Sequence, residues 1–223
     1  RKITYIIKWM VVAFFVTTIF SVIIYKYVPV YVTPLMVIRT VSSSESIHHK
    51  WISLEDMPKD IVKAVIASED AHFLSHNGFD FKAIKQAIEH NKKNNKTKRG
   101  ASTISQQTAK NVFLWPSRSW LRKGLEAYFT VLIELFWDKQ RIIEVYLNSI
   151  EMGNGIFGIA AVADKHFDKE PEELTKRQCA LIAATLPNPI KFNSTAPSPY
   201  MRKRQRVILR EMKSVKIEDE WFQ

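Results

Sequence analysis

The longest apolar run of the chain lies near its N-terminus, where no charged residue occurs between Lys8 and Lys26. A helix needs about 20 mainly apolar residues to cross the hydrocarbon core of a bilayer. Lys26 can extend its ammonium group towards water while its stem stays in the apolar layer, so the span continues beyond it. We therefore predict a short tail over residues 1–8 and a transmembrane helix over residues 9–28.

The charges around this helix indicate its orientation. Arg1, Lys2 and Lys8 precede it, and positively charged flanks stay in the cytoplasm. A cleaved signal peptide would have a shorter apolar core and small residues at its cleavage site, which the sequence VPVY at 28–31 does not offer. We expect a retained single-pass anchor in the cell membrane, with the rest of the chain on the outer, periplasmic side.

Beyond the anchor the pattern divides the chain in two. Residues 29–57 contain prolines and a serine run, which is typical of an extended connector, and Leu35–Val41 is expected to form a short strand. Further on, apolar residues recur at helical spacings, as from Ile61 to Val65. No run of alternating strands appears, although the pattern leaves room for one buried β-hairpin. We predict a mainly α-helical domain over residues 58–223.

Three of its helices can be placed more closely. A strongly apolar helix is expected over Leu121–Trp137. Thr175 and Gln178 form a capping box that starts a helix ending at Leu186. Pro199 begins a last, basic helix.

The formal net charge of +11 favours anionic partners such as nucleic acid, acidic lipid headgroups or phosphorylated substrates. The basic residues share motifs with acidic ones, and a domain outside the cytoplasm meets no chromosome. We therefore expect no nucleic-acid partner.

Glu69 and Asp70 form an acidic pair at the end of an apolar helix. A helix C-terminus disfavours negative charge, and apolar neighbours disfavour an ionised carboxylate. Together these effects could make a general base suited to neutral pH. The alternative is a solvated acidic helix end with His72 and His76 as caps.

A second cluster runs from Gly100 to Asn111 (GASTISQQTAKN) and consists largely of hydroxyl and amide side chains, with Lys110 near its end. Such a row supplies donors for hydroxyl-rich or phosphate-bearing ligands. Ser102 could cap a helix starting near Thr103, whose N-terminus would favour an anion. The alternative is a polar surface helix, although such helices normally carry more charge.

A third cluster comprises Arg122, Lys123 and Glu126, with Arg118 shortly before it. On a helix the first three share one face, because residues three and four apart are neighbours. Two cations and a carboxylate there could hold a pyrophosphate and a metal ion, and an intrahelical ion pair is the alternative. The sequence from Leu125 onwards is mostly apolar, so we expect Glu126 at a polar–apolar boundary.

These clusters resemble the motifs of the peptidoglycan glycosyltransferases of carbohydrate family 51, and within them the monofunctional biosynthetic peptidoglycan transglycosylases. The motifs occur in order as E-D-x-x-F-x-x-H-x-G-x-D from Glu69 to Asp80, G-A-S-T-I-S-Q-Q-x-x-K-N from Gly100 to Asn111, R-K-x-x-E from Arg122 to Glu126, K-x-x-I-[IL]-E-x-Y-L-N from Lys139 to Asn148, and a fifth at Ala180–Pro189.

The resemblance implies a lysozyme-like helical glycosyltransferase fold with a membrane-facing jaw. It implies lipid II as substrate, a disaccharide-pentapeptide on undecaprenyl pyrophosphate. The sugars would be joined by β-1,4 linkage with inversion, and the pyrophosphate lipid released. A divalent cation, Mg²⁺ or Mn²⁺, often assists in this family. The chain ends at Gln223, and we expect no transpeptidase domain.

The resemblance also implies roles for single residues. Glu69 is the expected general base for the acceptor's sugar 4-hydroxyl, and Asp70 would assist or orient it. Glu126 is the expected second catalytic carboxylate, and two roles stay open for it: holding a metal ion at the pyrophosphate, or stabilising positive charge on the donor sugar. The other expected substrate contacts are Phe73, Ser102, Thr103, Gln106, Gln107, Lys110, Asn111, Arg118, Arg122 and Lys123.

The expected partners are lipid II, the growing glycan chain, membrane lipid and other cell-wall synthesis proteins. One alternative enzyme is a lytic transglycosylase or lysozyme-like protein, which cleaves finished peptidoglycan and needs no pyrophosphate-binding cations. A non-catalytic membrane scaffold is the other alternative, and it would have no use for two carboxylates among cations.

Overall fold

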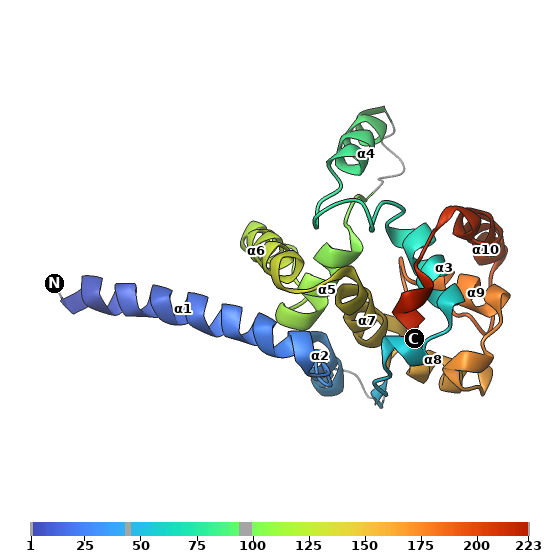
Figure 1. The fold of residues 1–223 in the computed structure, drawn as a ribbon, viewed down its shortest axis with the longest axis horizontal. Helices are drawn as coiled ribbons and strands as arrows, with labels where there is room; N and C mark the ends of the chain where they lie inside the picture. Colours follow the sequence, from blue (N-terminus) through green and yellow to red (C-terminus); the bar gives the residue numbers. More distant parts are fainter. Residues whose placement is uncertain (1, 43–45, 94–99, 223) are drawn as a thin grey trace.

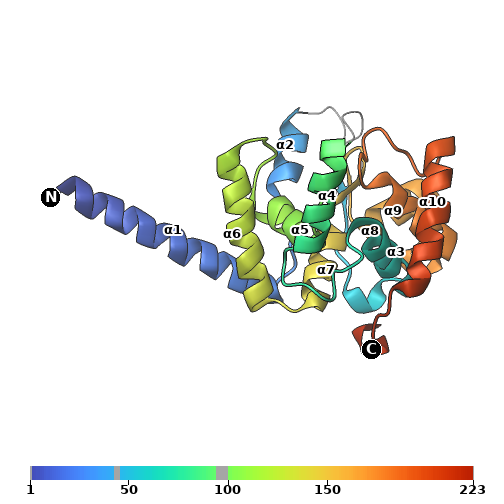
Figure 2. The same ribbon diagram turned by 90° about the horizontal axis from the view of Figure 1, so that it is seen from above.

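The computed structural model describes residues 2–42, 46–93 and 100–222, and these ranges are mainly α-helical, as predicted. Figure 1 shows a helical body from which α1 (Lys2–Tyr27) projects. From above, α6 (Trp120–Phe136) lies next to the base of α1, and α10 (Pro199–Glu211) lies at the opposite end of the body (Figure 2).

Helix α1 has the length and composition of a membrane span. Its 26 residues rise roughly 39 Å at 1.5 Å per residue, more than the hydrocarbon core of about 30 Å. Within α1, Val22 is the single buried residue, whereas a core helix would bury most of its apolar side chains. The predicted helix is confirmed, although it begins at Lys2 and ends at Tyr27, and it is apolar enough to cross a bilayer.

The remaining helices build the body. They are α2 (Pro34–Ser42), α3 (Lys59–Glu69), α4 (Phe81–Lys93), α5 (Ile104–Phe113), α6, α7 (Lys139–Ser149), α8 (Ile159–Phe167), α9 (Lys176–Thr185) and α10, with short 3₁₀ turns at Leu54–Asp56, Pro171–Glu173, Met212–Ser214 and Asp219–Phe222. Helix α6 lies within one residue of its predicted bounds, the Thr175–Gln178 capping box starts α9, and Pro199 begins α10.

The strand predicted over Leu35–Val41 is wrong, because this segment is helix α2. Pro34 fixes a backbone angle suited to the first helical residue, and the hydroxyl of Thr33 accepts a hydrogen bond from the N–H of Met36 at 3.2 Å. Met36 is buried. The start signal and the burial of one face outweigh the β-propensity of the branched side chains, which is a weak and context-dependent preference.

Three short strands form a small sheet in the order β1 (His48–His49), β3 (Ile156–Phe157) and β2 (Glu151–Gly153). Strands β2 and β3 form an antiparallel hairpin, and β1 pairs in parallel with β3. The hairpin for which the sequence left room is therefore present.

Helix α5 lies at the centre of the packing. It contacts α6 and α7, while α3 contacts α9 and α10. Fully buried apolar side chains join these helices, among them Ile61 and Ile66 of α3, Ile104 of α5 and Ile142 of α7. The C-terminus of α3 and the N-terminus of α5 consequently meet in a tightly packed region.

The cap of α5 differs by one position from the prediction. Thr103, not Ser102, is the capping residue: its hydroxyl accepts from the N–H of Gln106 at 3.1 Å, and Gln106 accepts from the N–H of Thr103 at 3.0 Å. Ser102 is exposed. A reciprocal capping box satisfies two backbone donors at once, an advantage that a cap at Ser102 would lack, because its N3 position is Ser105.

Candidate active site

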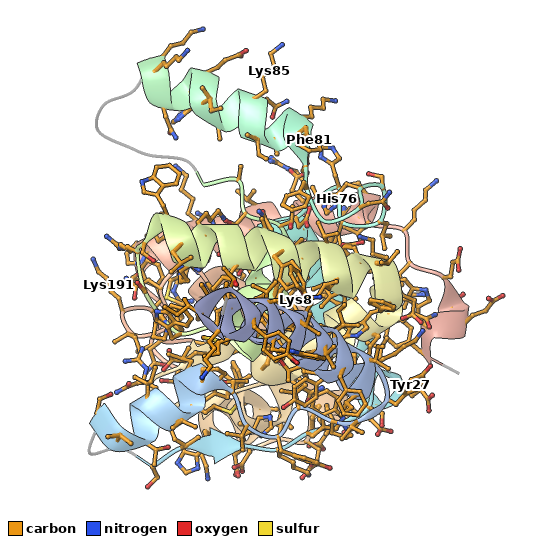
Figure 3. The ribbon with its side chains drawn as sticks, turned by 90° about the vertical axis from the view of Figure 1, so that its left-hand side faces the viewer. Lys8, Tyr27, His76, Phe81, Lys85 and Lys191 are labelled. Atoms are coloured by element: carbon orange, nitrogen blue, oxygen red, sulfur yellow. The ribbon has the colours of Figure 1, made fainter. Side chains whose placement is uncertain are left out.

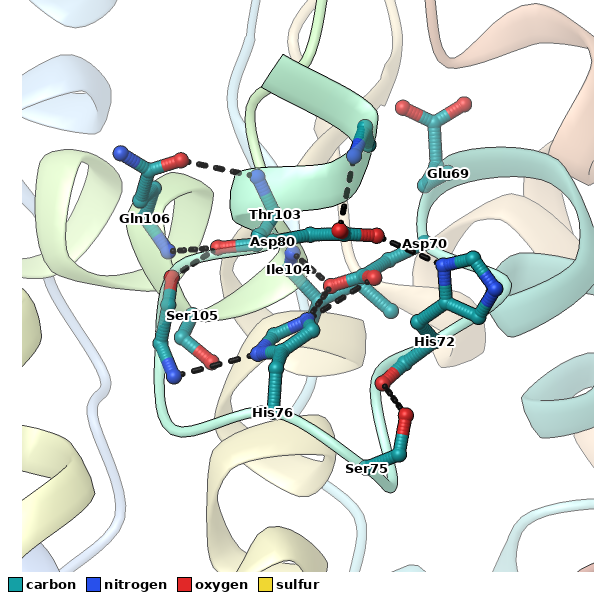
Figure 4. A network of polar contacts seen from close by, with 12 residues as sticks. Glu69, Asp70, His72, Ser75, His76, Asp80, Thr103, Ile104, Ser105 and Gln106 are labelled. Atoms are coloured by element: carbon teal, nitrogen blue, oxygen red, sulfur yellow. Dashed lines mark hydrogen bonds and ion pairs between the residues drawn. The ribbon is translucent and has the colours of Figure 1, made fainter. Parts of the chain in front are cut away.

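The acidic pair lies where α3 ends. Glu69 is the last residue of α3 and Asp70 caps it. The side chain of Asp70 is 3% exposed. Its carboxylate accepts a hydrogen bond from the N–H of Ile104 at 2.9 Å and from Nε2 of His76 at 3.0 Å, as Figure 4 shows. A solvated acidic helix end is therefore wrong for Asp70, which ties the end of α3 to the start of α5.

The turn that supplies His76 is itself fixed. Nδ1 of His76 accepts a hydrogen bond from the N–H of Gly78 at 3.1 Å. Nδ1 must then be unprotonated, which leaves the proton on Nε2 for the bond to Asp70. Gly78 has φ +85°, and a Cβ there would lie 2.7 Å from Cγ2 of Thr130, so only glycine fits. The hydroxyl of Thr103 donates to the carbonyl of Gly78 at 2.6 Å.

A second histidine–carboxylate pair follows in the same loop. Nδ1 of His72 lies 2.7 Å from Asp80, whose carboxylate also accepts from the N–H of Ala83 at 2.8 Å and so supports the start of α4. Burial acts to raise the pKa of Asp80, but the hydrogen bonds from Ala83 and His72 outweigh it, and the pKa is lowered overall. The loop between α3 and α4 is thus held by part-buried polar contacts.

Glu69 faces a pocket of about 580 Å³. Its side chain is 14% exposed, and its carboxylate accepts hydrogen bonds from Gln107 Nε2 at 3.2 Å and Ser68 Oγ at 3.1 Å. Arg204 of α10 lies 3.4 Å from the same carboxylate. We call this space the base pocket; its polar lining also includes Asp70, His72, Asp80, Gln86, Ser102 and Thr103.

Tyr146 determines how Gln107 is oriented. Its hydroxyl donates to Oε1 of Gln107 at 3.1 Å, so the amide nitrogen of Gln107 is turned towards Glu69. Tyr146 is fully buried, and burial, with the charges of Glu69 and Asp70, raises its pKa well above the usual value. The phenol therefore keeps its proton and remains a donor at neutral pH.

Cations gather in a second pocket, of about 460 Å³, beyond the next turn of α5. Lys110, Asn111, Arg118 and Arg122 line it together with apolar residues such as Leu114. We call it the cation pocket. Gln107 and Lys110 are three residues apart on α5, and such positions are neighbours on one helix face, so α5 joins the two pockets.

Glu126 is ion-paired with Arg122, which lines the cation pocket. Arg122 donates to its Oε2 at 2.7 Å, and Lys123 donates to Oε1. The predicted shared face is confirmed, and the ion pairs that were the alternative are present. Glu126 is 3% exposed, which places it deeper than the expected polar–apolar boundary. Its two oxygens are therefore engaged in holding the cations.

Lys110 is influenced by both carboxylates. Burial lowers its pKa, as do Arg122 and Lys123, whereas the charges of Glu126 and Glu69 act to raise it. The net direction is downwards. An anion bound in the cation pocket would oppose that trend and favour the charged ammonium group.

Two guanidinium nitrogens are hydrogen-bond donors that lack an acceptor within the described part of the chain. Nε of Arg204, in the base pocket, and Nε of Arg122, in the cation pocket, are buried and have no hydrogen-bond partner among the described residues. Buried donors without partners are costly, and a ligand rich in oxygen atoms would satisfy them.

The structure places the sequence-predicted contacts in three different settings. Those that line a pocket are Asp70, Ser102, Thr103, Gln107, Lys110, Asn111, Arg118 and Arg122. Phe73 is fully buried and Gln106 is 5% exposed. These two support the site from inside the core, where Gln106 caps α5. Lys123 is exposed and paired with Glu126.

Sequence reasoning missed Arg204 and the role of Tyr146. Arg204 lies on the basic last helix, outside the matched motif runs. The sequence of that helix does not distinguish Arg204 from the neighbouring cations. Tyr146 occurs within the fourth motif run, but a buried donor to Gln107 cannot be read from spacing.

The metal expected at Glu126 does not fit the residues present. Among the described residues, no group of three or more His, Cys, Asp or Glu side chains could hold a metal ion. Both oxygens of Glu126 are already paired with cations. We therefore derive no chemical step from a metal at this residue.

Taken together, the fold and the two pockets define a class of enzyme. A buried carboxylate beside a polar pocket can take a proton from a hydroxyl, and the adjoining cations can stabilise a phosphorylated leaving group. Such a site suits group transfer from a phosphorylated donor to a hydroxyl acceptor.

Comparisons with known proteins place the chain more closely. A family model described as Transglycosylase matches residues 36–213, so the chain belongs to this family. It is 57% identical over 220 residues to the biosynthetic peptidoglycan transglycosylase of Bacteroides thetaiotaomicron, covering 96% of this chain and 88% of that relative. The protein of that name from Bdellovibrio bacteriovorus is 53% identical over 210 residues, covering 91% and 84%. These matches confirm the predicted family and its lysozyme-like helical fold.

Proposed function

We propose that this protein polymerises lipid II into β-1,4-linked glycan strands and releases undecaprenyl pyrophosphate. The family membership supports glycosyl transfer. The observation that carries the proposal is the arrangement along α5, where Gln107 contacts Glu69 and Lys110 lines the cation pocket one turn later. A carboxylate for the acceptor and cations for the donor pyrophosphate are thus held by one helix.

The reaction follows from this arrangement. The acceptor's 4-hydroxyl lies in the base pocket and loses its proton to Glu69 as its oxygen attacks C1 of the donor sugar. The bond from C1 to the pyrophosphate oxygen breaks, and its electron pair leaves with the pyrophosphate. Lys110, Arg118 and Arg122 stabilise the charge that develops there. Attack opposite the leaving group inverts C1, through an oxocarbenium-like transition state.

The cation pocket also favours polymerisation over cleavage. A lytic enzyme protonates a glycosidic oxygen and releases no pyrophosphate, so it has no need for several cations beside Glu126. No observation favours the non-catalytic scaffold.

Glu69→Gln tests the role of the base. The amide cannot accept a proton, so polymerisation should fall about 10²–10⁴-fold, the usual contribution of a general base, while binding of lipid II is retained. Gel analysis of product from labelled lipid II measures the first quantity, and a binding titration measures the second. Glu172→Gln, at an exposed position, is the matched control, and a Glu69→Gln enzyme that polymerises at the wild-type rate would exclude the role.

For Glu126 we propose that its carboxylate holds Arg122 and Lys123 in place through its two ion pairs. Glu126→Gln should lower the polymerisation rate because the amide pairs weakly with both cations, and added Mg²⁺ or Mn²⁺ should not restore the rate. The measurement is a metal titration of wild type and variant, with a chelator-treated sample as reference. Recovery of the variant at high metal concentration would instead support the metal role.

We propose that α1 spans the cell membrane and that the helical body lies on its outer side. The cations before the apolar run support this orientation. Phe81 and Trp120 are 76% and 92% exposed, and α4, with Phe81 and Lys85, stands apart from the body (Figure 3), as suits a jaw that touches lipid. Protease added to intact spheroplasts should digest the body, and its protection would refute the orientation.

A further inference from the structure

The last turn of α1 is hydrogen-bonded to the body by one arginine. Arg141, near the start of α7, donates to the carbonyl of Tyr25 from Nε at 3.0 Å and from a terminal nitrogen at 2.7 Å. The same terminal nitrogen donates to the carbonyl of Val28 at 2.6 Å. The guanidinium group therefore binds two carbonyls at the end of the anchor helix.

The carbonyl of Tyr25 is one of those that a helix leaves without partners, and Val28 follows directly after the end of α1. The last four C=O groups of an α-helix accept no hydrogen bond from within the helix. Near an apolar layer, where water is scarce, leaving such a carbonyl without a donor costs free energy. The carbonyl of Ile24 is satisfied by the N–H of Val28 at 3.0 Å, and Arg141 satisfies the next one. A cation at this end also complements the helix dipole.

Arg141 is itself held rigidly. Another of its nitrogens donates to Glu144 at 2.6 Å, and its guanidinium group lies 5.1 Å from the centre of the Trp51 ring. Its side chain is 12% exposed. Glu144 in turn accepts from the N–H of Leu54 at 3.2 Å. The guanidinium group of Arg141 is thus held in one orientation by contacts other than those to the carbonyls of Tyr25 and Val28.

Two further polar contacts lie along the same face of α1. Nε1 of Trp137 donates to the carbonyl of Val22 at 2.8 Å. The hydroxyls of Thr18 and Tyr128 lie 2.8 Å apart. These contacts and those of Arg141 fix both the direction and the rotation of α1 on the body.

The helix that holds the anchor also reaches the active site. Arg141 lies near the start of α7, and Tyr146 of the same helix orients Gln107 beside Glu69. A single rigid helix therefore connects the end of the membrane span to the contacts of the proposed base.

We propose that Arg141 is a positioning residue, which locks the anchor helix to the catalytic body so that the two pockets meet the membrane at a fixed height and tilt. This inference rests on the proposed function. Lipid II is held in the bilayer by its polyprenyl tail, so the position of its sugars is set by the membrane and that of Glu69 by the anchor. A tether raises the effective concentration only when its geometry allows both ends to engage.

The test compares two substrates with the full chain. Arg141→Gln is assayed on long-chain lipid II in vesicles and on a short-chain, water-soluble lipid II analogue in detergent. We expect a rate roughly tenfold below wild type in vesicles, since small misplacements of reacting groups cost factors of this order or more, and a near-wild-type rate in detergent. The detergent assay also shows that the variant is folded.

Two other variants sharpen the comparison. Lys26→Met removes a cation at the same end of α1. Its ammonium group lies 5.6 Å from the centre of the Tyr27 ring and makes no hydrogen bond to a carbonyl in the part of the chain that the structure describes, so this variant should behave like wild type in vesicles. Trp137→Phe keeps an aromatic ring but loses the donor to Val22, so it should show the vesicle-specific loss to a smaller degree.

These measurements distinguish a failure of the positioning role of Arg141 from a failure of the proposed polymerase function. An equal loss of polymerisation rate on both substrates would show that Arg141 only supports folding. An unchanged rate in vesicles would show that the bonds from Arg141 to α1 are not needed to position the site. Either outcome overturns the inference and leaves the proposed function intact. A wild-type enzyme that polymerises neither substrate would overturn the proposed function itself.

Discussion

The buried carboxylate of Asp70 is the contact on which the rest of the site depends. It joins the C-terminus of α3 to the N-terminus of α5 through the N–H of Ile104, and it binds the turn at His76. Burying a carboxylate is costly unless its oxygens are hydrogen-bonded, and here the backbone of α5 and an oriented imidazole supply the bonds. Removing the contact would leave a helix donor and a histidine without partners.

The geometry of both pockets follows from this junction. Glu69 precedes Asp70, so fixing Asp70 fixes the height of the proposed base relative to α5. Gln107 and Lys110 are then placed by the helix itself, the first beside Glu69 and the second in the cation pocket. Helix α7, which packs against α5, adds Tyr146 and binds the end of α1 through Arg141. Glu69, the cations of the second pocket and the end of α1 are therefore all held by one group of packed helices.

Much of this could be predicted from the sequence, because it depends on local pattern. The anchor, the apolar helix α6, the capping box of α9 and the three clusters of polar residues follow from hydrophobic periodicity and from motif spacing. The prediction failed at α2, where burial of Met36 and a proline start outweighed the β-propensity of its branched residues. The cap of α5 differed by one residue, because Thr103, and not Ser102, has a glutamine three positions later.

Contacts between distant segments could not be predicted in this way. Arg204 reaches Glu69 from the last helix, Tyr146 orients Gln107 across a helix interface, and Arg141 binds the carbonyls of α1. No periodicity encodes such pairs, since each depends on how helices pack. Phe73 and Gln106 show the same limit: their motif positions suggested substrate contacts, whereas packing places both inside the protein.

The role of Asp70 as the junction between α3 and α5 is tested most directly by the steady-state kinetics of Asp70→Asn with lipid II. Nε2 of His76 lies 3.0 Å from both oxygens of Asp70, and one of these also accepts from the N–H of Ile104. The asparagine oxygen can keep the bond to Ile104, but the NH₂ group that replaces the other oxygen faces the N–H of His76 as a second donor, so the junction is loosened without a change of volume. We expect kcat to fall roughly 10–100-fold while KM changes little, because Glu69 loses its position and the cation pocket is untouched. A folded Asp70→Asn enzyme with a wild-type kcat would contradict this role.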